Sequence, residues 1–322
     1  SSYGDGQAVF QWADPGAELR GYKLNTFRIL VSYITIDGAV GGGSDADDYG
    51  FKLVMAPNFG GSAEGYTDYD WWTAVSIGAV GESDLALTNI TLQHIAAIGP
   101  AITKDYSCFH DGSCSNEGVS AYLLETGSLT NMTLESSLLT HWNNNISIRL
   151  TTNLNISNNY VSDNWSSSTG DHGQNINIDG ITNGVIKDNK IIRSKEFAIA
   201  IHRNADPDYT GTSGLKIYNN LFYGANPSMS GFISTMGNQS DGITEGLQVH
   251  HNTLVDQNCG GKGFVGVTTI TDPTVISYVY NNLFYNTENC RLDNSGYTQN
   301  MITHDYNAYL SSTNYTSEAH SQ

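Results

Sequence analysis

"LKIYNNLFY" (Leu215 to Tyr223) and "YVYNNLFY" (Tyr278 to Tyr285) are nearly the same phrase, written twice more than sixty residues apart. Weaker copies of it, each built around an asparagine, occur elsewhere. The anchor asparagines are Asn159, Asn189, Asn220, Asn252, Asn282 and Asn307. Their successive spacings are 30, 31, 32, 30 and 25 residues. Self-similarity at a nearly fixed period is typical of repeat architectures. Three upstream stretches, "VSYITIDGAV", "LTNITLQHI" and "LTNMTLESSLL", fit the same frame without the asparagine, so the sequence contains about nine turns of one repeat.

The local chemistry of each repeat favours strands over helices. Short alternating runs such as "ISIRL", "INIDG" and "LKIYN" are rich in β-branched and aromatic residues and are bounded by Gly, Asn, Asp and Ser. Three short strands per turn account for a period of this length. We therefore predict an all-β chain in which residues 1–322 form one domain, a right-handed parallel β-helix of about nine to eleven coils between about 13 and 310. The anchor asparagine is expected at a tight turn, where it tolerates the left-handed conformation and bonds to its counterpart in the next coil.

The charge balance limits the partners. The 322 residues include 14 Lys+Arg and 32 Asp+Glu, a formal net charge of −18. So acidic a chain is not expected to bind nucleic acid, whose phosphates need basic partners, and it captures an acidic polysaccharide by simple electrostatics only if a cation bridges the two. No apolar run approaches the length of a membrane span. The first residues, "SSYGDGQAVF", lack the basic and apolar parts of a signal segment, which is expected of a mature or excised chain.

Sequons and cysteines indicate an extracellular or cell-surface protein. Four cysteines can pair into two disulfides, which form in oxidising compartments; the alternative is four buried thiols in a cytoplasmic protein. Asn-x-Ser/Thr sequons mark candidate glycosylation sites in a glycosylating host. They lie at Asn89, Asn131, Asn145, Asn155, Asn164, Asn238 and Asn314.

"GAELRG…FRILVSYITIDGAV", followed by coils carrying the anchor asparagine, resembles the secreted β-helix superfamily of polysaccharide lyases and related carbohydrate-active enzymes. Within it, "INIDGITNGVIKDNKII…FAIAIHRN" is similar in layout to the chondroitinase-B and alginate-lyase group. The resemblance implies an acidic ligand and a lysine base on one strand, with an arginine on the next coil. Arg203 falls near the arginine position, whereas Asn177 and Asp179 stand where the glutamate and lysine of the group would be.

Counting from the anchor asparagines predicts which side chains stack between coils. Arg149 lies ten residues before Asn159, and Asp179 lies ten residues before Asn189. Matching "INIDG" to "IAIHR" adds His202 to this column. A second column has Glu125, Ser147 and Asn177, and three pairs precede the strands at similar offsets. The pairs are His141-Trp142, Asp171-His172 and Lys195-Glu196.

This clustering of basic and imidazole groups suits lyase chemistry on an acidic polysaccharide. β-Elimination needs a cation to neutralise the carboxylate, a base to remove the α-proton and an acid to protonate the leaving oxygen. We assign the base to Lys195 or His172, the clamp to Arg149 or Arg203, and the acid to His202. The remaining candidates for substrate binding are His141, Trp142, Asn177 and Asp179.

Three alternatives stay open. The stacked side chains can instead form a solvated polar face, in which Arg149 and Asp179 form an ion pair between coils. Hydrolysis by two carboxylates, Asp179 with Asp171 or Asp206, is the enzymatic rival. The chain can also be a structural or adhesive surface protein whose coils self-associate end to end into a filament or coat, without catalysis.

Acidic loops are candidate calcium sites, because Ca²⁺ prefers hard oxygen ligands. Asp206 and Asp208 in "NADPDYTG" carry such ligands at alternate positions. They match no established calcium-loop pattern, so a solvated acidic loop is the alternative.

The spacing of the cysteines predicts local disulfides. Cys108 and Cys114 bracket a short loop, and Cys259 and Cys290 lie about one coil apart, so the expected pairs are 108–114 and 259–290. Peptide mapping without reduction should recover both linked pairs. Four alkylatable thiols in the native protein would contradict the prediction.

Overall fold

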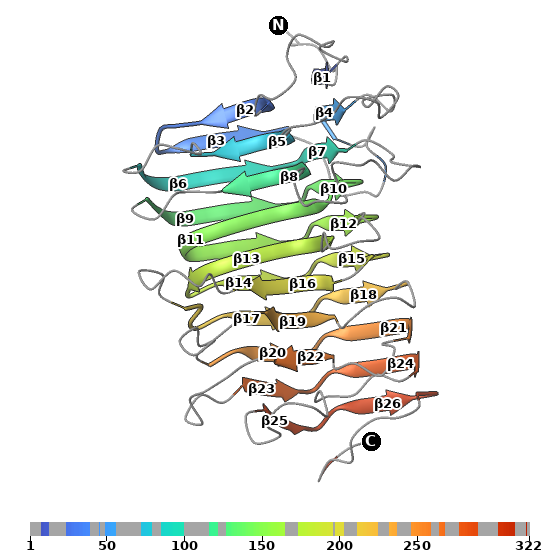
Figure 1. Cartoon of the computed structure of the whole chain (residues 1–322). Coiled ribbons are helices and arrows are strands. Elements are labelled where there is room, and N and C mark those ends of the chain that lie inside the picture. The colour runs from blue at the N-terminus through green and yellow to red at the C-terminus, as the bar shows by residue number, and fades with distance from the viewer. Residues whose placement is uncertain are drawn as a thin grey trace, which may run out of the picture.

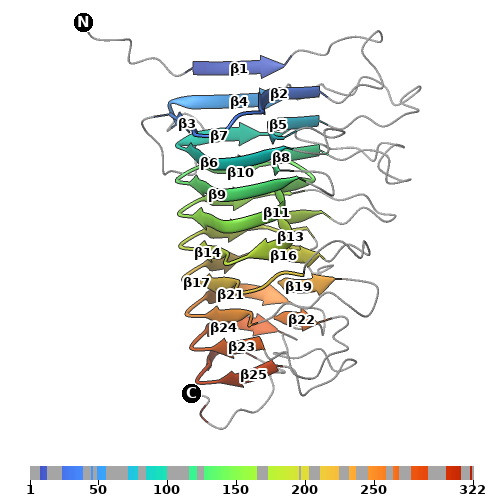
Figure 2. The same cartoon turned by 90° about the vertical axis from the view of Figure 1, so that its left-hand side faces the viewer.

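The computed structural model describes residues 8–12, 24–38, 45, 49–55, 72–78, 85–99, 116–121, 127–164, 173–195, 197–202, 211–224, 232–236, 246–258, 264–267, 277–288, 302–312 and 320. These residues form stacked coils that run from the N-terminal strand to the C-terminal one (Figure 1), and the view at 90° shows the same stack edge on (Figure 2). Every strand pair is parallel, and the described residues include no helix. The predicted right-handed parallel β-helix is confirmed.

A complete coil contributes strands to three sheets, which we number in the order in which the coil visits them. Sheet 1 carries the candidate site. Its strands are β2 (Leu24–Ile29), β5 (Trp72–Ile77), β8 (Asn116–Ala121), the first half of β11 (Asn144–Ser157), most of β13 (Gln174–Thr182), β16 (Phe197–His202), β19 (Ile233–Met236) and β22 (Val265–Val267).

Sheet 2 follows sheet 1 around each coil, and β11 passes from one to the other without a break. Its strands are β3 (Ile34–Asp37), β6 (Ala86–Gln93), β9 (Ser128–Glu135), the second half of β11, β14 (Val185–Lys187), β17 (Lys216–Tyr218), β20 (Gln248–His250), β23 (Ser277–Tyr280) and β25 (Ile302–Asp305).

Sheet 3 completes each coil, and its ten strands set the number of coils in the described part of the chain at ten, within the predicted range. Its strands are β1 (Ala8–Trp12), β4 (Phe51–Met55), β7 (Ile95–Ile98), β10 (Leu138–Thr140), β12 (Tyr160–Ser162), β15 (Lys190–Ile192), β18 (Leu221–Tyr223), β21 (Thr253–Asn258), β24 (Leu283–Glu288) and β26 (Ala308–Leu310).

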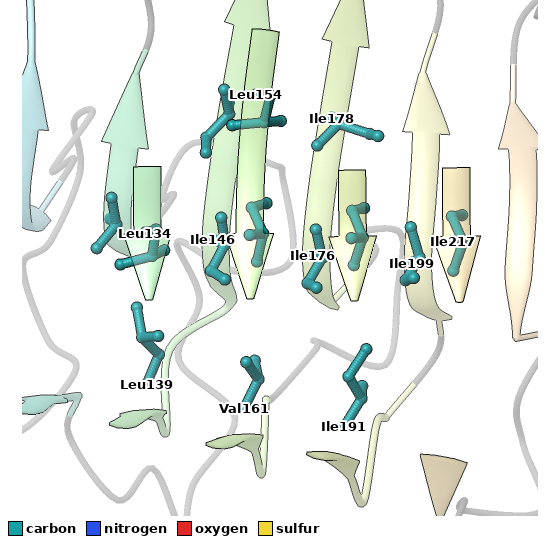
Figure 3. Close-up of a cluster of buried hydrophobic side chains, with 14 of the residues drawn as sticks. Leu134, Leu139, Ile146, Leu154, Val161, Ile176, Ile178, Ile191, Ile199 and Ile217 are labelled. Atoms are coloured by element: carbon teal, nitrogen blue, oxygen red, sulfur yellow. The ribbon is translucent and has the colours of Figure 1, made fainter. Parts of the chain in front are cut away.

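The core is a set of columns of apolar side chains that point inward from all three sheets (Figure 3). Ile146, Ile176 and Ile199 stack in register on sheet 1 and are fully buried. Val161 and Ile191 face them from sheet 3. Because side chains alternate across a strand, the residues between these core positions point outward. Among the described residues, no helix has the length and apolar character needed to cross a membrane.

The anchor asparagines form one continuous buried column at the corner between sheets 2 and 3. Asn220 Oδ1 accepts hydrogen bonds from the backbone N and the Nδ2 of Asn189, both at 3.0 Å. Asn220 Nδ2 donates to Asn252 Oδ1 at 3.0 Å and to the carbonyl of Ile186 at 2.9 Å. The same pattern continues through Asn282 to Asn307, so the predicted stacking is confirmed.

Two further asparagine ladders, which the sequence analysis did not recognise, occupy the other corners. Between sheets 1 and 2, Asn153 Nδ2 donates to Asn131 Oδ1 at 2.9 Å, and Asn131 Nδ2 donates to Asn89 Oδ1 at 3.0 Å. All three have φ near +58°. Between sheets 3 and 1, Asn145 Nδ2 donates to Asn175 Oδ1 at 2.6 Å, and both side chains are fully buried. Each corner thus uses the amide side chain to link successive coils.

We expect Asn220→Ala to lower the free energy of unfolding by about 2–5 kcal/mol, because it leaves the backbone N of Asn189 and the carbonyl of Ile186 buried without these partners. Urea denaturation measures the change. The matched control is Asn219→Gly at the adjacent exposed position, where φ is +55° and the cost should stay near 0.5 kcal/mol. Equal losses in the two variants would contradict the assigned role of the ladder.

Candidate functional site

The outward side of sheet 1 carries polar side chains that are buried. Ser147 lies between the core residues Ile146 and Ile148 on β11 and therefore points away from the core, yet it is only 2% exposed. By contrast, Tyr285, which points outward from sheet 3, is 43% exposed. Burying a polar group costs about 1–3 kcal/mol unless it is hydrogen-bonded. The outward side of sheet 1 therefore has to hold a connected polar network.

The register of sheet 1 confirms the column predicted from offsets. Arg149 on β11 lies opposite Asp179 on β13, which lies opposite His202 on β16. The Nε of Arg149 is 3.9 Å from Oδ2 of Asp179, whose side chain is 5% exposed. A cation, a carboxylate and an imidazole thus meet on three adjacent strands. We call these three residues the charged column.

A second column of small polar side chains runs beside the first. Ser120 on β8, Ser147 on β11 and Asn177 on β13 lie opposite one another in register. Both serines are buried, whereas Asn177 is partly exposed. The pairing of Ser147 with Asn177 confirms that part of the predicted column. Ser120, and not Glu125, lies opposite Ser147; Glu125 itself lies outside the described residues.

Glu117 on β8 is the acidic member of the network that the sequence analysis missed. It lies opposite Asn144 of β11 and is 4% exposed. Burial raises the pKa of its carboxyl above the usual 4.5; hydrogen bonds with the side chains of Ser120, Ser147 and Asn144, and the nearby charge of Arg149, only partly oppose this. Burial thus shifts the ionisation equilibrium of this carboxyl toward its neutral form.

In the coil that contains β8, counting back from the anchor position selected Glu125 instead of Ser120, and the reason is structural. Residues 122–127 separate β8 from β9 in this coil, whereas β11 runs through the same corner without a break. The count backward from the anchor is therefore shifted. The alternation of residues in "NEGVSA" could have predicted the correct register. It matches Val119 and Ser120 to Ile146 and Ser147 of "NNISIR".

The structure separates two residues that the sequence analysis assigned to one reaction. Lys195 precedes β16, and its backbone N donates to Asn164 Oδ1 at 2.8 Å, whereas His202 ends β16. The six residues from Phe197 to His202 span about 16 Å of extended strand. Lys195 and His202 therefore lie at opposite ends of β16, and their assignment as base and acid stays a prediction.

His141 lies in a stack of charged side chains at the corner between sheets 3 and 1. Its Nδ1 is 2.9 Å from the Oγ1 of Thr140. In the next coils, Arg193 makes a bidentate ion pair with Asp163. Burial opposes ionisation of Asp163, but the hydrogen bonds from Arg193 hold the pKa of this carboxyl below its ordinary value. His141 thus belongs to a corner stack and not to the charged column.

Trp142 is not a surface platform for substrate, contrary to the prediction. Its side chain is 2% exposed and packs in the core, and its Nε1 donates to the carbonyl of Ala97 at 3.1 Å. Gly118 leaves room for the indole, since a Cβ there would lie 3.0 Å from Trp142 Cδ1.

Two of the predicted glycosylation sites are also corrected. Asn145 is fully buried in the corner ladder, and Asn164 is 5% exposed. Neither amide is accessible in the folded chain. Asn89, Asn131 and Asn155 keep side chains at the surface, at least in part.

Several predicted residues lie outside the described residues, and the corresponding predictions stand as they were made. They are the candidate base His172, the candidate clamp Arg203, the acidic pair Asp206 and Asp208, the cysteines Cys108, Cys114, Cys259 and Cys290, and the sequons at Asn238 and Asn314. Within the part of the chain that is described, no group of three or more His, Cys, Asp or Glu side chains is arranged to hold a metal ion.

The sheets themselves define the class of this protein, a right-handed parallel β-helix. No protein-family model and no curated protein matches the chain. The chain is similar to the solved structure of DFA-IIIase from Arthrobacter chlorophenolicus A6 without its lid, at 12% identity over 91% of this chain and 86% of that chain, with a TM-score of 0.43. It is also similar to the A-module of the mannuronan C-5 epimerase AlgE4 from Azotobacter vinelandii, at 11% identity over 93% of this chain and 91% of that chain, with a TM-score of 0.30. A third similar structure is XylC in complex with xylose, at 10% identity over 85% of this chain and 54% of that chain, with a TM-score of 0.28. Such low similarity transfers no residue roles, so the site rests on its own geometry.

The buried state of Glu117 predicts a specific pH dependence. A carboxyl whose pKa is raised by folding stabilises the fold below its unfolded pKa of about 4.5, and that contribution is lost as the pH rises through the folded value. Relative to the wild type, Glu117→Gln should therefore gain free energy of unfolding as the pH increases from 4 to 8. Urea denaturation at several pH values measures the difference, and parallel profiles for the two proteins would refute the assignment.

Proposed function

We propose that this chain is an extracellular, carbohydrate-active β-helix protein that cleaves an acidic polysaccharide by a lyase-type reaction on the outward side of sheet 1. The observation that carries the proposal is the charged column, Arg149, Asp179 and His202, on three adjacent strands. The fold does not need these groups, because the strand pairing, the core columns and the asparagine ladders already hold the coils together. Buried, interacting titratable groups cluster at functional sites more often than elsewhere.

The chemistry assigned to each residue follows from its type and its neighbours. Arg149 carries a permanent charge whose planar donors suit a carboxylate, so it neutralises the uronate group and acidifies the α-proton. His202, which lies opposite Asp179, protonates the leaving oxygen, while Lys195 or His172 removes the α-proton. Glu117 is buried beside the network, and burial raises the pKa of its carboxyl.

Self-association of the coils into a filament or coat is the competing function. Calcium is proposed only as a cation that bridges the chain and an acidic polysaccharide. One assay tests the cleavage, the self-association and the need for calcium. The protein is incubated with alginate, pectate and glycosaminoglycans, with and without Ca²⁺, while the absorbance of unsaturated products is followed and sedimentation reports assembly.

We expect His202→Gln to lower the rate of product formation about 10²–10⁴-fold, the usual contribution of a positioned acid or base. The matched control is His250→Gln, a partly exposed histidine on the outer side of sheet 2, which should leave the rate unchanged. Lys195→Ala and His172→Ala test the remaining candidate bases in the same assay, with Lys190→Ala, an exposed lysine of sheet 3, as their control.

Cleavage that persists in His202→Gln would remove the charged column from the mechanism. No cleavage of any acidic glycan, together with filaments in sedimentation, would favour the structural function instead.

A further inference from the structure

The outer side of sheet 3 presents apolar side chains in its last coils, far from the charged column in sequence and on a different sheet. Tyr223, Val255, Tyr285 and Leu310 lie opposite one another on β18, β21, β24 and β26. Tyr223 and Tyr285 are 42% and 43% exposed. We call this column, with its neighbour Leu221, Thr253, Leu283 and Ala308, the tyrosine face.

A row of polar side chains borders the tyrosine face. The residue after each of the last three members of the tyrosine column turns the corner with positive φ, +52° at Asp256, +50° at Asn286 and +54° at Ser311. All three are exposed, and Asn286 Nδ2 donates to Asp256 Oδ1 at 2.6 Å. Exposed aromatic rings with carboxylate and amide groups along one edge offer a sugar both stacking and hydrogen bonds.

Charge restricts the partner further. The chain carries a net charge of −18 and the two columns offer no basic residue to offset it, so a second copy and an anionic polymer are both repelled from this face. The two columns of the tyrosine face contain no charged residue between β18 and β26. An uncharged ligand meets neither repulsion nor an unpaired charge on this surface.

The spacing of the rings matches one kind of uncharged polymer. Tyr223 and Tyr285 are two strands apart, which corresponds to about 9.6 Å at the usual spacing of neighbouring strands. In an extended β-(1→4)-linked polysaccharide, every second pyranose ring turns the same face to one side, at a similar repeat. A chain of this type laid along the stack of coils can place alternate rings on the two tyrosines and the intervening ring over Val255.

We propose that the tyrosine face binds an uncharged, extended β-(1→4)-linked polysaccharide along the axis of the solenoid. This binding surface is separate from the proposed cleavage site and would hold the protein on a neutral glycan while sheet 1 acts on another polymer. It does not depend on the proposed lyase activity.

Isothermal titration of the full chain with cellohexaose, xylohexaose, mannohexaose and N-acetylchitohexaose tests the proposal. We expect saturable binding of at least one hexasaccharide and an affinity at least tenfold lower in the double variant Tyr223→Ala/Tyr285→Ala. Tyr278→Ala is the matched control, because Tyr278 is 41% exposed but lies on sheet 2, and it should bind like the wild type. Thermal unfolding verifies that all variants are folded.

Three outcomes would overturn the proposal: no binding of any of the four sugars, undiminished binding by the double variant, or a dimer of the wild type that the double variant abolishes. The last would assign the tyrosine face to a second copy. His202→Gln should bind the hexasaccharide normally, so failure of the cleavage assay and failure of the binding assay remain distinguishable.

Discussion

From Asn159 to Asn307, successive coils depend on the hydrogen bonds that link their corner asparagines. A backbone that turns sharply three times per coil leaves N–H and C=O groups at the corners without a strand partner, and buried groups of this kind have to be paired. Asn252 shows how one side chain answers this need. Its Oδ1 accepts from the backbone and the side chain of Asn220, while its Nδ2 donates to Asn282 and to the carbonyl of Ile217. The asparagine column keeps successive coils in register, and this register aligns the strands and the core side chains of neighbouring coils.

Register between coils is also the reason that side chains far apart in sequence form rows. A residue at a given position of one coil lies next to its counterpart in the following coil, and the row runs along the axis of the stack. Such rows suit a linear polymer, which offers its own repeating groups in the same direction. The charged column on sheet 1 and the tyrosine face on sheet 3 are two rows of this kind with opposite chemistry. One concentrates charge in a buried network, and the other presents uncharged rings to solvent.

The outer surfaces differ in the kind of side chain that they bury, and the outward side of sheet 1 buries titratable ones. Glu117, Ser147 and Asp179 are each less than 5% exposed although they point away from the core. On sheet 2, the rings of Tyr218, His250 and Tyr280 stack on one another 5.0 Å apart and remain partly exposed. Side chains of the latter kind stabilise neighbouring coils by contact alone. A buried network that includes a carboxyl with a raised pKa contributes less to the stability of the fold. This is the physical reason for placing function on sheet 1.

The period of the asparagines, together with the alternating β-branched runs between them, determined the fold, the stacking at one corner and the pairing of Arg149 with Asp179, and the match of "INIDG" to "IAIHR" added His202. This was possible because β11 and β13 cross their first corner without an insertion, so that equal offsets mean equal positions. Tertiary structure alone decided which side chains are buried and which positions an insertion shifts within a coil. Residues 122–127 shifted the count and concealed Glu117, while the packing of neighbouring coils turned Trp142 and Asn145 into the interior and left Tyr223 and Tyr285 outside. A repeat specifies the position of each residue within a coil, but its exposure depends on the side chains that the adjacent coils place against it.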